Sequence, residues 1–343
     1  MKKIYIHIGI EKTGSTAIQG FLHENSQLLA DEYQILIPTW ENDTSINTHY
    51  RMSKAFVPNK NISPEHKIIS IEYFKDILNG YENSNYFKKL IISSELFSYS
   101  TAKEIKELKA TLQNFDVSII VFLRRQDEYI ESLYNQHVKR IWLMNRPPTN
   151  AITFHKSKKL NFHKFLLQWY KNGFENIDLK IYGLSKSKDF IFHQFFKNID
   201  ASVLENENVI IRYEPANPSL SLFHTILINK HIPKVKDEIL RKKAAQLIFD
   251  HNMFFSKISN NQILVQKSQY SKQFKIELLE KYEKSNIEIL KMFPNSGFSK
   301  DSLFNPVKNY EKPLSINDLT KDQIMMYFFN LLLFLIKKFD NKK

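Results

Sequence analysis

Residues 7–19 read His-Ile-Gly-Ile-Glu-Lys-Thr-Gly-Ser-Thr-Ala-Ile-Gln, and this stretch decides the fold. It follows the apolar residues Ile4, Tyr5 and Ile6 and leads into apolar residues at helical spacing, so it predicts a strand, a loop and a helix. The backbone N–H groups of such a loop point to one spot at the helix N-terminus, where the helix dipole carries partial positive charge. The sequence therefore predicts a loop that holds a phosphate group.

The two glycines of this loop, Gly9 and Gly14, have the G-x-x-x-x-G spacing of a P-loop. Ser15 stands where the nucleoside-triphosphatase pattern requires a lysine, and the lysine lies inside the loop, at Lys12. A lysine there can reach the oxygen that bridges a phosphate to the group being transferred, so it can replace a metal ion. Ser15 and Thr16 begin the helix and can donate to the phosphate. The alternative is a strand, turn and helix that bind nothing.

The segment Lys-Thr-Gly-Ser-Thr after a first strand resembles the 5′-phosphosulfate loop of sulfotransferases that use 3′-phosphoadenosine 5′-phosphosulfate (PAPS). The resemblance implies a P-loop-like fold and a product nucleotide, 3′-phosphoadenosine 5′-phosphate (PAP). It also implies that the nucleotide is bound by Lys12, Thr13, Gly14, Ser15 and Thr16.

Strand and helix patterns alternate along the first half of the chain. The apolar runs Ile35–Ile37, Leu90–Ile92 and Val117–Leu123 predict strands with helices between them. This alternation predicts an α/β fold, a central parallel sheet flanked by helices, with the first strand in the middle. The later part of the chain is mostly helical in its pattern. We expect one α/β domain over residues 1–300 and a C-terminal helical extension over residues 301–343.

Several helix boundaries can be predicted from local signals. One helix is expected to carry the apolar residues from Ile18 to Leu29. Ser63-Pro64 begins another helix, and Gly80 ends it. Thr101 and Glu104 have the spacing of a capping box for a third helix.

The net charge of +13, from 49 Lys and Arg against 36 Asp and Glu, attracts anions. A nucleotide, an acidic polysaccharide and an anionic membrane face all fit this charge, whereas nucleic acid ranks last because no nucleic-acid-binding motif is present. The absence of cysteine suits a reducing compartment, and Lys2-Lys3 is followed by too few apolar residues for a signal peptide. We expect a cytoplasmic protein. No metal-ligand motif occurs, so we predict no metal requirement.

Two residues are candidates for the general base that takes the proton of an acceptor hydroxyl. Glu95 follows the apolar run that ends at Ile92, and the carboxyl ends of parallel strands meet at the ligand-binding edge of a sheet. Burial there can raise the pKa of Glu95 toward the working range. His49 lies in the polar stretch between Trp40 and Asn61, and the resemblance implies that a histidine near this position faces the acceptor. The alternative for Glu95 is a structural carboxylate.

Arg124 follows the strand that ends at Leu123, and Ser132 lies eight residues further on in the next helix. The resemblance implies that this pair binds the 3′-phosphate of the nucleotide. An arginine offers a fork to two phosphate oxygens, and the serine hydroxyl adds a donor from the same side. Gln126 and Tyr129 stand where animal carbohydrate sulfotransferases often have a proline and a second arginine, so the segment looks more like bacterial members. The alternative is a solvated arginine and a surface serine.

Two further segments allow alternative interpretations. The basic run His155–Lys159 can form a lip over an acceptor channel or a solvated charge cluster. The stretch 324–338 contains the most apolar run of the chain, but it is too short to span a bilayer. It packs against the domain or a second subunit, or it lies on the inner membrane surface beside a lipid-linked glycan.

The sequence thus predicts a sulfotransferase that moves a sulfuryl group from PAPS to a carbohydrate hydroxyl, in a bacterial surface polysaccharide or glycolipid. A P-loop nucleotide kinase is one alternative. It would need a lysine in place of Ser15 and an acidic strand end for Mg²⁺, where this chain has Arg124 and Arg125. A non-catalytic protein that binds a nucleotide or a glycan on the same fold is the other alternative.

Overall fold

The computed structural model describes residues 1–38, 48–58, 63–144, 158–185, 187, 189–212, 232–258 and 272–294, with scattered positions from 220 to 228, at 270 and from 321 to 334. The chain forms two compact units. The first, called here the sheet unit, comprises Met1–Arg125, Lys158–Ala216 and Tyr282–Asn305. The second, called the helical unit, comprises Gln126–Ser157, Asn217–Lys281 and Pro306–Lys343. The helical unit therefore takes residues from within the range 1–300. Most of residues 301–343 lie outside the described part, so the extension stays a prediction.

The sheet unit contains five parallel strands in the order β2-β3-β1-β4-β5. The strands are β1 (Lys3–His7), β2 (Ile35–Leu36), β3 (Lys89–Ser93), β4 (Asp116–Leu123) and β5 (Ile177–Ile181). β1 pairs with β3 on one side and with β4 on the other, so the predicted α/β fold with a central first strand is confirmed. The carboxyl ends of β1 and β3 lie level, because His7 is opposite Ser93.

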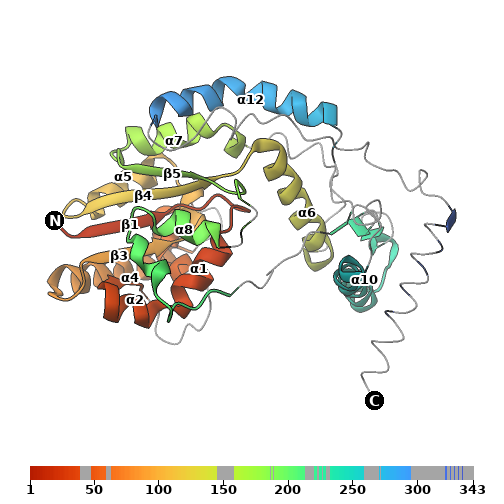
Figure 1. The fold of residues 1–343 in the computed structure, drawn as a ribbon, viewed down its shortest axis with the longest axis horizontal. Coiled ribbons are helices and arrows are strands. Elements are labelled where there is room, and N and C mark those ends of the chain that lie inside the picture. Colours follow the sequence, from red (N-terminus) through yellow and green to blue (C-terminus); the bar gives the residue numbers. More distant parts are fainter. Residues whose placement is uncertain are drawn as a thin grey trace, which may run out of the picture. The chain divides into compact units, whose positions relative to one another are not determined.

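Helices cover both faces of this sheet (Figure 1). One face packs against α1 (Ser15–Glu24), α2 (Ser26–Tyr33) and α8 (Phe190–Phe196), which bury their apolar residues against Tyr5, Ile91 and Ile120. The opposite side in Figure 1 carries α5 (Ala102–Thr111) and α7 (Phe162–Lys171), which contact each other. The remaining elements of the unit are α3 (Thr48–Ser53), η1 (Lys54–Phe56), α4 (Pro64–Asn83), η2 (Glu95–Tyr99), η4 (Lys158–Leu160), η5 (Ala201–Glu205) and the second half of α12 (Lys272–Met292).

The helix expected from Ile18 to Leu29 is in fact two helices, because the chain breaks at Asn25. The buried Asn25 side chain donates to the carbonyl of Ile210 at 2.9 Å and accepts from the Ile210 N–H at 2.8 Å. A side chain that binds the backbone in this way competes with continuation of the helix. The break therefore joins the start of the chain to a segment nearly two hundred residues later, at a sequence separation of 185.

The other boundary signals hold with one exception. Ser63 caps α4 through the N–H of His66, and the capping box of Thr101 and Glu104 forms. The prediction that Gly80 ends α4 is wrong, since the helix runs to Asn83. Tyr81, one turn along the buried face from Leu78, is fully buried and holds the last turn in place.

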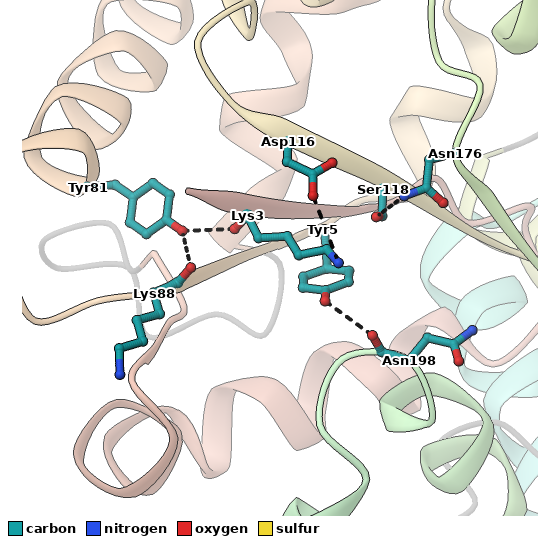
Figure 2. A network of polar contacts seen from close by, with 8 residues as sticks. All are labelled: Lys3, Tyr5, Tyr81, Lys88, Asp116, Ser118, Asn176 and Asn198. Carbon is teal, nitrogen blue, oxygen red and sulfur yellow. Dashed lines mark hydrogen bonds and ion pairs between the residues drawn. The ribbon is translucent and has the colours of Figure 1, made fainter. Parts of the chain in front are cut away.

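Tyr81 lies at the amino ends of β1 and β3, where its side chain bridges the two strands (Figure 2). Its hydroxyl lies 2.8 Å from the carbonyl of Lys3 and 2.7 Å from that of Lys88, so one proton is shared between two strand starts. In the same view the hydroxyl of Tyr5 donates to the carbonyl of Asn198 at 3.1 Å. The Tyr81 hydroxyl thus links the starts of β1 and β3, and Tyr5 links β1 to the segment after α8.

The helical unit contains α6 (Gln126–Met144), η6 (Ile232–Lys234), α10 (Glu238–Ile258) and the first half of α12 (Lys272–Met292). Tyr134 and Val138 of α6 form its apolar cluster with Leu220, Ile228, Ile232 and Ala245. The fully buried Lys275 lies 2.9 Å from the Glu131 carboxylate. Within the described residues, no helix has the length and apolar character to cross a membrane.

Candidate functional site

The loop between β1 and α1 turns sharply at two positions. Lys12 and Gly14 have φ angles of 66° and 86°, in the left-handed region, and Gly14 is the N-cap of α1. The buried Thr13 hydroxyl donates to the carbonyl of Ile10 at 2.5 Å. The carbonyl of Gly14 accepts from the N–H groups of Ala17 and Ile18, which begins the helix. The loop is therefore closed on itself at the positive end of the α1 dipole.

Close contacts disfavour a Cβ atom at both glycines of the loop. A Cβ atom at Gly9 would lie 2.5 Å from the Ser15 hydroxyl oxygen and 3.4 Å from Cγ of Glu95. A Cβ atom at Gly14 would lie 2.2 Å from Cδ1 of Ile191. In addition, Gly14 has a positive φ angle, which residues with a Cβ atom rarely adopt. The Gly9–Gly14 spacing read from the sequence thus has a steric cause in this fold.

Ser15 is buried beside Gly9, and its hydroxyl has no hydrogen-bond partner at normal geometry among the described residues. It lies near enough to the Glu95 carboxylate to lower the pKa of Glu95. Buried hydroxyl groups in folded proteins are nearly always satisfied. An unsatisfied hydroxyl at a helix N-terminus is a suitable donor for an anionic ligand.

Glu95 lies two residues after β3, at the start of η2. Burial raises the pKa of Glu95, the negative charge of Glu11 raises it further, and Ser15, Lys12 and Lys159 lower it. Glu95 lies next to the loop that carries Lys12, as expected from the meeting of the carboxyl ends of β1 and β3 at one edge of the sheet. The negative charge of Glu11 favours the protonated form of Glu95, and Lys12 and Lys159 favour its ionised form. Glu95 can therefore exist in either form and can accept a proton.

A pocket of about 300 Å³ opens beside Glu95. It lies along the loop after β1, the start of α1, α3 and η2. The described residues that line it are Glu11, Thr16, Gln19, Tyr50, Ser94, Glu95, Leu96 and Tyr99. Only Thr16 and Glu95 of these were predicted site residues, because the others carry no motif. Their position in the chain could have identified them, because each lies in the loop or helix that follows β1 or β3, or in α3.

Lys159 joins the two loops that border this pocket. Its ammonium nitrogen lies 3.8 Å from the Glu11 carboxylate, 3.0 Å from the Ser98 hydroxyl and 3.3 Å from the centre of the Tyr99 ring. The Tyr99 hydroxyl in turn donates to the Glu11 carboxylate. Burial lowers the pKa of Lys159 to about 8, although Glu11 and Glu95 raise it. Lys159 ends the predicted basic lip; residues 155–157 lie outside the described part.

His49 is buried, and the structure gives both of its ring nitrogens a backbone contact. Nε2 lies 3.0 Å from the carbonyl of Pro38, and Nδ1 accepts from the N–H of Ser93 at 2.8 Å. Burial lowers the pKa of His49 to about 4. His49 therefore positions the end of β3, two residues before Glu95. This geometry favours Glu95 over His49 as the base.

Arg124 extends from the end of β4 toward the loop, where its guanidinium donates to the carbonyl of Lys12 at 3.2 Å. The guanidinium carbon also lies 5.2 Å from the centre of the Tyr182 ring. Ser132 lies on α6, in the helical unit. The pairing of Arg124 with Ser132 at a 3′-phosphate therefore stays a prediction.

Comparisons with known proteins leave the family open. No family model matches the sequence, and no curated protein matches it. Among the described residues, no three His, Asp or Glu side chains lie close enough together to hold a metal ion.

Proposed function

We propose that this protein transfers a sulfuryl group from PAPS to a hydroxyl group of a carbohydrate, in a bacterial surface polysaccharide or glycolipid, and that it does so in the cytoplasm. One observation carries the proposal: the Gly9–Gly14 loop at the end of β1 lies beside Glu95 at the end of β3, with Lys12 close enough to act on the Glu95 charge. The loop proposed to hold the phosphate and the carboxylate proposed to accept the proton thus adjoin one pocket, and this arrangement supports group transfer to a hydroxyl.

In the proposed reaction the acceptor oxygen forms a bond to sulfur while the bond from sulfur to the bridging phosphate oxygen breaks. The electron pair of that bond moves to the 5′-phosphate, and the acceptor proton moves to Glu95. Lys12 offsets the charge that grows on the bridging oxygen. Glu95 must be ionised to act, and its desolvated position makes it a stronger base than an exposed carboxylate.

The residues of the loop fit the 5′-phosphate of such a donor. The buried Ser15 hydroxyl lies at the N-terminus of α1, next to Gly9 and the Glu95 carboxylate, where it can donate to that phosphate. The family resemblance assigns the 3′-phosphate to Arg124 and Ser132. A kinase is disfavoured because the end of β4 carries Arg124 in place of a carboxylate for Mg²⁺.

The proposal is tested with labelled PAPS and calorimetry on the full chain. PAP should bind, and labelled sulfate should pass to a carbohydrate acceptor. Lys12→Ala should lower turnover about 10²- to 10³-fold while part of the PAP affinity remains, because Lys12 acts mainly on the developing charge. Lys106→Ala, a change at an exposed position on α5, serves as the control and should leave both measurements unchanged.

Three results would argue against the proposed function. Near-normal sulfation by Lys12→Ala would remove the role of the loop. Absence of PAP binding by the wild-type chain would remove the nucleotide. PAP binding without transfer to any carbohydrate would favour the non-catalytic alternative.

A further inference from the structure

The pocket beside Glu95 has a composition that restricts its ligands. The eight described residues that line it include two carboxylates, two tyrosines and no lysine or arginine. This is unexpected in a chain with a net charge of +13, which favours anionic partners at long range. The volume of about 300 Å³ is at the small end for ligand pockets and suits one monosaccharide unit.

The two tyrosines offer flat surfaces at the pocket. Tyr50 and Tyr99 are 46% and 45% exposed. Each ring has a lysine ammonium near it: Lys54 lies 4.8 Å from the centre of Tyr50, and Lys159 lies 3.3 Å from the centre of Tyr99. These cation–π contacts hold the two rings in place before a ligand binds, so less conformational entropy is lost on binding. A sugar ring presents an apolar C–H face for such a surface and a rim of hydroxyl donors for the carboxylates and Gln19.

Glu11 is held rigidly at the pocket wall. The Tyr99 hydroxyl donates to one carboxylate oxygen, and Lys159 lies 3.8 Å from the other. The Glu11 charge already acts across the pocket, because it is one cause of the raised pKa of Glu95. Lys159 offsets part of the Glu11 charge from one carboxylate oxygen, and a carboxylate or sulfate of a ligand placed against the carboxylate itself would meet the charge that remains.

We propose that this pocket binds an uncharged sugar unit of the acceptor, and that Glu11 is the specificity-determining residue that rejects uronate or sulfated units. This inference rests on the proposed function and names its acceptor class. A neutral sugar can donate its hydroxyl protons to Glu11, whereas an acidic sugar places a negative charge beside it.

Matched sugars test the inference by binding, without the need for transfer. The probes are p-nitrophenyl β-glucoside and β-glucuronide, which differ only at C6, and the corresponding galactoside and galacturonide. Saturation-transfer NMR with the full chain gives their affinities. In at least one pair we expect the neutral sugar to bind about tenfold more tightly than its uronide, a difference typical of one like-charge contact.

Variants then assign the discrimination to Glu11. Glu11→Gln should raise uronide affinity about tenfold, since the charge is removed. It should weaken neutral-sugar binding by less than that, because the amide oxygen still accepts a hydroxyl proton. Glu11→Asp keeps the charge and should retain the preference. Glu72→Gln, at an exposed position on α4, is the control and should match the wild type.

The outcomes separate this inference from the proposed function. Equal or tighter binding of the uronides, binding of none of the four sugars, or an unchanged ratio in Glu11→Gln would each overturn the inference. None of these results bears on PAP binding, which calorimetry measures separately. Loss of PAP binding would overturn the function and would leave the sugar preference as a property of the pocket.

Discussion

Glu95 is the single residue on which the proposed chemistry depends most. Because it takes the acceptor proton in that reaction, Glu95→Gln should lower turnover about 10²- to 10⁴-fold, while size and hydrogen-bonding shape are kept. PAP affinity should hardly change. A transfer assay beside a melting curve checks this prediction. A structural Glu95 would give the opposite pattern, with a lower melting temperature and normal turnover per folded molecule.

The pH dependence of turnover should follow the neighbours of Glu95. Since burial and Glu11 raise the pKa of Glu95, activity should fall on the acid side at a pH above the ordinary value of 4.5. Removing the Glu11 charge in Glu11→Gln should move this acid limb to lower pH. Removing a cation in Lys159→Met should move it to higher pH, because Lys159 lowers the pKa of Glu95. Rate profiles of both variants that coincide with the wild type would remove Glu95 as the titrating group.

Among the elements, the proposed function depends most on the loop between β1 and α1, and Gly14 joins this loop to α1. An alanine there must adopt a φ of 86° and displace Ile191 and Tyr182. The left-handed conformation alone costs about 1–2 kcal/mol for a residue with a Cβ atom. Gly14→Ala should therefore lower the unfolding free energy by at least that amount and weaken PAP binding about tenfold or more through the displaced loop.

Gly20 provides the matched control for this change. It lies inside α1, and a Cβ atom there would have no neighbour within 4 Å. Gly20→Ala should stabilise the protein by about 0.5–1 kcal/mol, because alanine has the higher helix propensity. Urea unfolding and PAP calorimetry measure both variants. Equal stability of Gly14→Ala and Gly20→Ala would contradict the steric account of the loop.

Across the whole molecule, three buried histidines link stability to pH. Burial lowers the pKa of His7 to about 3, that of His49 to about 4 and that of His224 to about 3, from 6.5. As the pH falls below 6.5, the unfolded chain binds protons that these folded residues cannot bind. Stability should therefore fall from pH 6.5 downward until the folded pKa values are reached, by up to about 1.4 kcal/mol per pH unit for each histidine.

Urea midpoints at pH 7.5 and pH 5.5 test this linkage. The midpoint should be lower at pH 5.5, and His49→Gln should show a smaller difference between the two values than the wild type. His66→Asn removes an exposed histidine at the start of α4 and should keep the wild-type difference. A wild-type midpoint that is the same at both pH values would contradict the prediction.

The sequence by itself determined the α/β architecture, the strand ends and the loop. These features depend on short-range signals: apolar runs for β1, β3 and β4, the Gly9–Gly14 spacing, and the local capping of α4 and α5. It also placed Glu95 correctly at a strand end, because parallel strands present their carboxyl ends at one edge. Local signals failed where a distant contact decided the outcome, as at Asn25, whose bonds to Ile210 split the expected helix.

Only the tertiary structure decided which side chains meet at the site. Glu95 was the first candidate for the base and His49 the second, and the sequence could not exclude His49. Folding placed the histidine between Pro38 and Ser93, where both ring nitrogens contact the backbone. Lys159 and Glu11 are 148 positions apart in the sequence (159 − 11 = 148), and nothing local pairs them. Such contacts between residues far apart in the sequence depend on how the elements pack in the folded chain. The pKa of a side chain depends in turn on the burial and the neighbouring charges that this packing gives it.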